Sequence, residues 1–159
     1  MVALITIKKN EEAGTKATVI AKFDNIVSAP IQRFALYSSK VAAGFPSPAD
    51  DYLELSLDLN EYLIKHPAAT FIVRAQGDSM RDAGIHNGDL LIVDRSIEAT
   101  HDKIVIAALN GELTVKRLFR KDGAVRLIPA NNTYSPIDIT EDVELVIWGV
   151  VTHIIHQAT

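Results

Sequence analysis

The stretch that decides the fold spans residues 104–119 and reads IVIAALNGELTVKRLF. Two apolar runs flank Asn110-Gly111, a dipeptide that favours a two-residue hairpin turn because both residues tolerate a positive φ. Asp122-Gly123 repeats this turn chemistry just before another apolar segment at 125–128. The sequence therefore predicts two consecutive β-hairpins.

Further β signals lie on both sides of these hairpins. Upstream, the apolar run 71–73 leads into a turn at Gly77, and the run 90–93 follows a second glycine turn. Downstream, the apolar stretch 143–155 holds the only tryptophan, Trp148. About six short strands at regular spacing, with little helix, predict a mainly β fold built on a compact, strongly twisted sheet.

The first 49 residues differ from the rest of the chain. They contain short apolar patches at 3–7 and 17–20 without a sustained helical period, and two prolines at 46 and 48 favour an extended, exposed backbone. A short helix is expected at 59–65, because Asp58 can cap its first turn and Glu61 follows three residues later. We therefore predict an N-terminal arm and linker at 1–49 and a folded β domain at 50–159.

The composition is that of a soluble globular protein. The chain has 159 residues, 48% of them hydrophobic and 23% charged, which suffices for one domain with a core. A net charge of −4 gives no sign of nucleic-acid binding through bulk electrostatics. The absence of cysteine excludes disulfides, cysteine-ligated zinc and a thiol nucleophile. Neither a secretory signal nor a run of about 20 apolar residues is present, so we expect a cytoplasmic protein without membrane contact.

Two residues have the chemistry of a nucleophile and a base. Ser79 follows Gly77 in a sharp turn, where the glycine permits unusual backbone angles and lets a substrate approach closely. Lys116 lies among apolar neighbours in a predicted strand, and it can accept the serine proton only if burial lowers its pKa. The backbone N–H groups of Asp78 and Ser79 are the candidate oxyanion hole.

Histidines offer alternative chemistry. His86 and His101 flank predicted turns, and either would be an alternative base because serine–histidine pairs are the commoner arrangement. His153 and His156 are three residues apart, and a strand would point them to opposite faces, which suits a shared metal poorly. We expect no metal and no other cofactor.

Several motifs together resemble the self-cleaving peptidase domain of the LexA/UmuD family. The similarity covers roughly residues 43–155 and includes FIVRAQGDSM at 71–80, GELTVKRL at 111–118, LIPAN at 127–131 and WGVV at 148–151. The resemblance implies a LexA/signal-peptidase-like fold with an extended N-terminal arm. It also implies that Ser79 and Lys116 form a Ser-Lys dyad, and that the bond between Ala43 and Gly44 is the one cut.

The segment GFPSPADDY at 44–52 is similar to the UmuD branch of that family. This similarity implies a role in the bacterial SOS response to DNA damage, in which a RecA filament on single-stranded DNA promotes self-cleavage and removes residues 1–43. The trimmed form would join a UmuC-type Y-family polymerase for error-prone translesion synthesis, and the family forms homodimers. The arm is longer than is typical of that branch, and Ala43 stands where cysteine is common.

Other functions remain alternatives. A LexA-like transcriptional repressor needs a helix-turn-helix, and the 43 residues before Gly44 hold no recognisable one, so no direct sequence-specific DNA binding is expected. A peptidase acting on other proteins, like signal peptidase, would share the Ser-Lys chemistry. A pure interaction module would have lost its activity.

Overall fold

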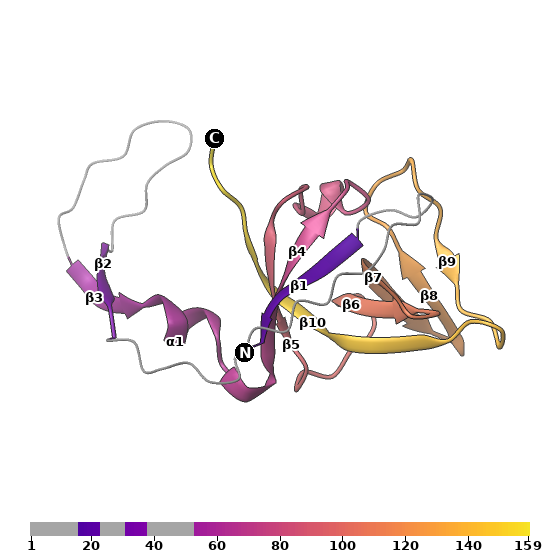
Figure 1. Cartoon of the computed structure of the whole chain (residues 1–159), viewed down its shortest axis with the longest axis horizontal. Coiled ribbons are helices and arrows are strands. Elements are labelled where there is room, and N and C mark those ends of the chain that lie inside the picture. The colour runs from indigo at the N-terminus through magenta and orange to yellow at the C-terminus, as the bar shows by residue number, and fades with distance from the viewer. Residues whose placement is uncertain (1–15, 23–30, 38–52) are drawn as a thin grey trace. The chain divides into compact units, whose positions relative to one another are not determined.

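The computed structural model describes residues 16–22, 31–37 and 53–159 (Figure 1). These residues belong to two compact units, one formed by 16–22 and 66–159 and the other by 31–37 and 53–65. The predicted scissile bond between Ala43 and Gly44 lies outside the described residues. Within the part of the chain described here, no helix has the length and apolar character needed to cross a membrane.

The larger unit is built on an eight-stranded sheet with the order β1-β4-β5-β10-β6-β7-β8-β9. Its neighbouring strands are antiparallel. The strands are β1 (Lys16–Lys22), β4 (Thr70–Gln76), β5 (Leu90–Asp94), β6 (Ile104–Leu109), β7 (Glu112–Lys121), β8 (Ala124–Ile128), β9 (Ile137–Asp138) and β10 (Leu145–Ile155). The mainly β fold predicted from the sequence is therefore confirmed.

Strand β1 closes part of this sheet on itself. It pairs with β4 along its length and also with β7, where Lys16 lies opposite Thr114. Because β4 and β7 are far apart in the strand order, this second pairing joins six strands into a ring. The closure brings the end of β4 next to the start of β7.

Both predicted hairpins are present. Asn110 and Gly111 have φ angles of 48° and 86° and connect β6 to β7, while Asp122 and Gly123 have φ angles of 52° and 78° and connect β7 to β8. Positive φ at both central residues is the signature of a type I′ turn, whose twist matches that of the flanking strands. These two turns set the register of β7.

The larger unit has two clusters of buried apolar side chains, one that includes Val73 and Leu91 and another that includes Val105 and Leu127. Their side chains come from the strands and from the turn after β4, and β5 and β6 bury consecutive residues because both of their faces are covered. Burying each large side chain contributes about 1.5–3 kcal/mol. The fully buried large apolar side chains are Val73, Met80, Ile85, Leu91, Ile92, Val93, Val105, Ile106, Val115 and Leu127.

Strand β10 contacts two neighbours and changes register at a glycine. It pairs with β5 and β6, and the register of the β6 pairing shifts between Ile147 and Gly149. A Cβ atom added at Gly149 would lie 2.8 Å from Cγ1 of Val93 and 2.9 Å from the carbonyl oxygen of Asp94. Glycine at this position therefore permits the close approach of β10 to β5.

The smaller unit holds a two-stranded antiparallel sheet and a short helix. Strand β2 (Arg33–Tyr37) pairs with β3 (Leu53–Asp58), and α1 (Leu59–Leu63) follows directly. The Asp58 carboxylate accepts hydrogen bonds from the backbone N–H groups of Asn60 and Glu61 at 2.9 and 3.4 Å, which confirms the predicted cap. The helix ends two residues before the predicted Lys65, because the backbone at Ile64 is extended.

Strands β1 and β2 both lie within the segment 1–49 that the sequence assigned to an arm and linker. The division of the chain into that arm and a domain at 50–159 stays a prediction. Two 3₁₀ turns, at Pro67–Ala69 and Arg81–Ala83, complete the described elements, and the second follows Ser79 in the turn after β4.

Candidate active site

Ser79 lies in the turn that follows β4. Gly77 has a φ of 91°, a conformation that glycine adopts without steric cost, and its N–H donates to Oδ1 of Asn87 at 2.9 Å. The side chains of Ser79 and its neighbour Met80 are both fully buried. The buried methionine anchors the turn, which fixes the direction of the serine hydroxyl.

A second segment, just after β8, holds the same turn from the other side. The N–H of Ala130 donates to the carbonyl oxygen of Ser79 at 2.8 Å, and the carbonyl oxygen of Ala130 accepts from the N–H of Asp82 at 2.8 Å. The buried side chain of Asn131 donates from Nδ2 to the carbonyl oxygen of Asp78 at 3.0 Å. The LIPAN motif therefore holds the serine turn in place by backbone pairing.

Tyr134 contacts the same turn through the Asp78 side chain. Its hydroxyl donates to Oδ1 of Asp78 at 2.6 Å, and this hydrogen bond is the main reason why the pKa of Tyr134 is raised above its ordinary value. The carboxylate of Asp78 is therefore held by a side-chain contact.

Lys116 lies in the middle of β7, and only 3% of it is exposed. Its Nζ atom lies 3.0 Å from Oγ of Ser79, 2.9 Å from Oγ1 of Thr114 and 3.0 Å from the carbonyl oxygen of Val115. Thr114 and Lys116 are two residues apart in a strand, so their side chains share one face. The structure thus brings together the two residues that the sequence singled out as nucleophile and base.

Burial controls the protonation of this amine. Desolvation lowers the pKa of Lys116 from 10.5 to about 8, because a charged ammonium is poorly stabilised away from water. The three contacts also suit the neutral form. An amine can donate to Thr114 and to the Val115 carbonyl, which only accepts, and still accept the hydroxyl proton of Ser79 with its lone pair.

Strand β1 passes beside this pair of residues. Lys16, its first residue, lies opposite Gln76 at the end of β4 and opposite Thr114 on β7. The backbone of β1 therefore bridges β4, which leads into the Ser79 turn, and β7, which carries Lys116. Sequence reasoning noted the apolar patch at 17–20 but did not predict this strand, since β pairing over such a distance leaves no local signal.

The alternative bases have other contacts. Nδ1 of His86 lies 3.7 Å from Oδ2 of Asp89, and Nδ1 of His101 accepts from the backbone N–H of Arg120 at 3.2 Å. Among the described residues, it is Lys116 that reaches the hydroxyl of Ser79. The geometry therefore favours lysine over either histidine.

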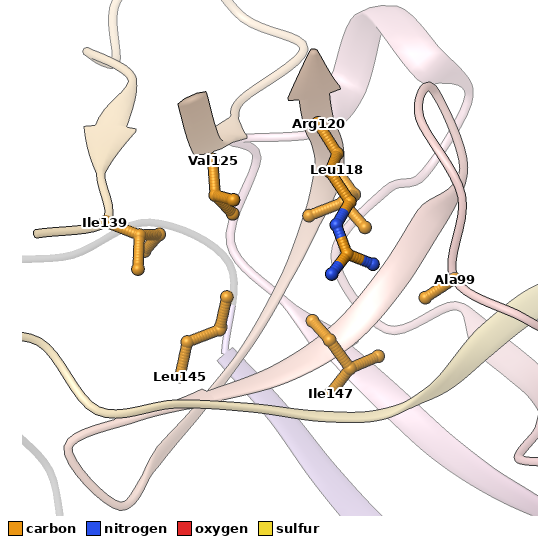
Figure 2. A pocket seen from close by; sticks show the side chains of 7 residues that line it. All are labelled: Ala99, Leu118, Arg120, Val125, Ile139, Leu145 and Ile147. Atoms are coloured by element: carbon orange, nitrogen blue, oxygen red, sulfur yellow. The ribbon is translucent and has the colours of Figure 1, made fainter. Parts of the chain in front are cut away.

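An apolar pocket of about 250 Å³ lies elsewhere on the larger unit (Figure 2). Its walls come mainly from β7, β8 and β10 and from the loops beside them. The lining residues are Ala99, Leu118, Arg120, Val125, Ile139, Leu145 and Ile147. It includes neither Ser79 nor Lys116, so we do not assign it to the candidate active site.

Comparisons with known proteins show which family this chain resembles. Residues 35–152 match the family model described as Peptidase S24-like. The chain is 43% identical to the protein MucA of Salmonella typhimurium over 132 residues, which are 82% of this chain and 90% of MucA. It is 51% identical to the protein SamA of the same species over 80% of this chain and 89% of SamA. LexA repressor 1 of Xanthomonas campestris is 36% identical over 97% of this chain and 73% of the repressor.

Proposed function

The chain belongs to the Peptidase S24-like family of serine peptidases, and from this premise we propose that it cleaves itself with Ser79 as the nucleophile and Lys116 as the general base. The observation that carries the proposal is the 3.0 Å contact between Nζ of Lys116 and Oγ of Ser79 in a buried site. A lysine with a pKa of about 8 is about half neutral at pH 8 and can accept a serine proton, whereas an exposed lysine cannot do so efficiently.

We infer the following reaction. The neutral amine of Lys116 takes the hydroxyl proton of Ser79 as Oγ attacks the carbonyl carbon of Ala43. The backbone N–H groups of Asp78 and Ser79 stabilise the oxyanion that forms. The ammonium of Lys116 then protonates the departing amine of Gly44, which leaves residues 1–43 as an ester on Ser79. A water molecule, deprotonated by Lys116, hydrolyses this ester and regenerates the serine hydroxyl.

The biological setting is SOS mutagenesis, the theme shared by the UmuD-like relatives of this chain. In this setting a RecA filament on single-stranded DNA promotes the cut in the cytoplasm. The product, residues 44–159, forms a homodimer and serves as the accessory subunit of a UmuC-type Y-family polymerase in translesion synthesis.

A transcriptional repressor is the second candidate function. The observation in its favour is the alignment with LexA repressor 1, which extends over 97% of this chain. A gel-shift assay with a panel of palindromic operator duplexes at physiological salt distinguishes the two functions. Sequence-specific binding supports the repressor. Binding that is equally weakened by salt for every duplex sequence does not support it.

The experiment that tests the peptidase function is intact mass spectrometry of the purified chain after incubation at pH 7.5 and pH 10. We expect a fragment that begins at Gly44, and we expect it to be absent from Ser79→Ala and Lys116→Ala. The exposed residues Ser135 and Lys103 supply matched controls, because Ser135→Ala and Lys103→Ala remove the same groups away from the site. If Lys116→Ala still produces a fragment that begins at Gly44 at pH 7.5, Lys116 is not the general base.

An unchanged mass in the parent chain at both pH values, even with RecA, nucleotide and single-stranded DNA, would contradict self-cleavage. The same variants then test the remaining hypothesis of a peptidase acting on other proteins. A peptide spanning residues 38–49, supplied separately, would be cut by the parent chain and not by Ser79→Ala.

A further inference from the structure

Three side chains at one end of the β4–β5 turn form a compact group of possible metal ligands. His86, Asp89 and His156 each offer one ligand atom, and these atoms all lie within 4.8 Å of one another. None of the three belongs to the candidate dyad. The group combines two imidazoles with one carboxylate, a donor set found in many zinc sites.

The sheet register brings these residues together across the sequence. Ile155 at the end of β10 lies opposite Leu90 at the start of β5, so the next residue along β10, His156, lies beside Asp89. The turn before β5 supplies the third residue. The backbone N–H of His86 donates to Oδ2 of Asp89 at 2.7 Å, which folds the turn around the carboxylate.

The backbone around Asp89 is fixed by the β4–β5 pairing. Its carbonyl oxygen accepts from the N–H of Ala75 at 2.8 Å, and the N–H of the preceding Gly88 donates to the carbonyl oxygen of Ala75 at 2.8 Å. The carboxylate is only 3% exposed, whereas the side chains of His86 and His156 are 50% and 54% exposed. One ligand is therefore rigid, and the other two can rotate and exchange with solvent.

The two histidine nitrogens lie near different oxygens of the Asp89 carboxylate, at distances below and above the one that a tetrahedral ion requires. Zn²⁺ binds nitrogen at about 2.0–2.1 Å and carboxylate oxygen at about 2.0–2.2 Å, so tetrahedral ligand atoms lie roughly 3.3 Å apart. Nδ1 of His156 is 2.6 Å from Oδ1 of Asp89, and Nδ1 of His86 is 3.7 Å from Oδ2 of Asp89. The two imidazole rings have their centroids 5.0 Å apart. Small rotations of the exposed histidines would place all three atoms around one ion.

We propose that His86, Asp89 and His156 bind one divalent zinc-class metal ion, with solvent in the remaining coordination position. Imidazole nitrogen selects zinc, copper or nickel over magnesium and calcium, which prefer an all-oxygen set. A bound ion would connect the segment after β10 to the turn between Ser79 and β5. The inference stands on these three residues alone and does not depend on the proposed peptidase function.

The test is isothermal titration calorimetry of Zn²⁺ into the full chain at pH 7.5, prepared without a histidine tag. We expect one ion per chain, and an affinity at least tenfold weaker in His86→Ala and in His156→Ala. His101→Ala and His153→Ala are the matched controls and should bind as the parent chain does, since neither residue belongs to the group. Mg²⁺ should give no binding in the same range.

Thermal unfolding provides a second readout. At a free Zn²⁺ concentration 100 times the Kd, we expect the Tm of the parent chain to rise by roughly 5–10 °C, and the rise to disappear in His156→Ala. Both histidines are half-exposed, so these variants should fold, and circular dichroism without metal checks that they do. A Kd weaker than about 1 mM, or equal affinity in the parent chain and both histidine variants, would show that the three residues form only a hydrogen-bonded cluster.

Discussion

The pH dependence of self-cleavage is the most direct consequence of the buried lysine. With a pKa of about 8, roughly 9% of Lys116 is neutral at pH 7 and roughly 91% is neutral at pH 9. If the neutral amine is the base, the rate constant for self-cleavage rises about tenfold between these pH values and then reaches a plateau. Burial accounts for the neutral fraction at pH 7, because the same lysine in water would be only about 0.03% neutral at that pH.

The other candidate bases predict different curves. An exposed lysine with a pKa near 10.5 gives an increase of almost 100-fold from pH 7 to pH 9 and no plateau there. A histidine with an ordinary pKa near 6.5 gives an increase of less than about 1.5-fold over the same range. The three bases can therefore be distinguished by the size of the increase and by where it stops.

The assay follows the first-order appearance of the fragment that begins at Gly44, by intact mass, from pH 6 to pH 10.5 at constant ionic strength without RecA. Circular dichroism at each pH confirms that the chain stays folded. A flat profile from pH 7 to pH 10 would refute a lysine base. A rise that continues unchanged through pH 10 would refute the link between burial and the lowered pKa.

Three further predictions concern residues of β7 and β10. The unfolded chain holds the Lys116 proton up to pH 10.5, but the folded chain holds it only up to about pH 8, so over this pH range the free energy of unfolding should rise by about 3 kcal/mol relative to that of Lys116→Met in parallel urea titrations. A constant difference between the two proteins would contradict the lowered pKa. Thr114→Val should slow self-cleavage about tenfold at pH 9, because the amine loses the oxygen atom 2.9 Å away that orients it; an unchanged rate would show that Thr114 does not position Lys116. Gly149→Ala should lower the free energy of unfolding by about 1–3 kcal/mol, since its Cβ would press on Val93 and on the backbone of Asp94, and urea midpoints equal to those of the parent chain would contradict that crowding.

Local chemistry explains which parts of the fold could be predicted from the sequence. The hairpins at Asn110-Gly111 and Asp122-Gly123 were predictable because their turns need a positive φ that these residues tolerate. The helix cap at Asp58 was predictable because an N-cap carboxylate satisfies N–H groups only two and three residues away. Each of these features is determined within a few residues.

Features that depend on distant pairing were harder to predict. Ser79 and Lys116 are 37 residues apart, and it was the resemblance to a family, not periodicity, that placed them in one site. Asp89 and His156 are 67 residues apart. Sequence reasoning instead considered His156 together with His153, which is close to it in the chain, as ligands of a shared metal. Strand β1 was missed for the same reason, because an apolar patch does not reveal which strand it will join.

The pairing of β1 with β4 has a consequence for what remains after a cut at Ala43-Gly44. Breaking that peptide bond does not itself release residues 16–22, which stay hydrogen-bonded to 71–76 as a separate peptide. The severed piece would leave by unzipping, at a rate set by strand separation and not by hydrolysis. Its departure would uncover one edge of β4, a row of unpaired N–H and C=O groups that can accept an extended segment from another protein.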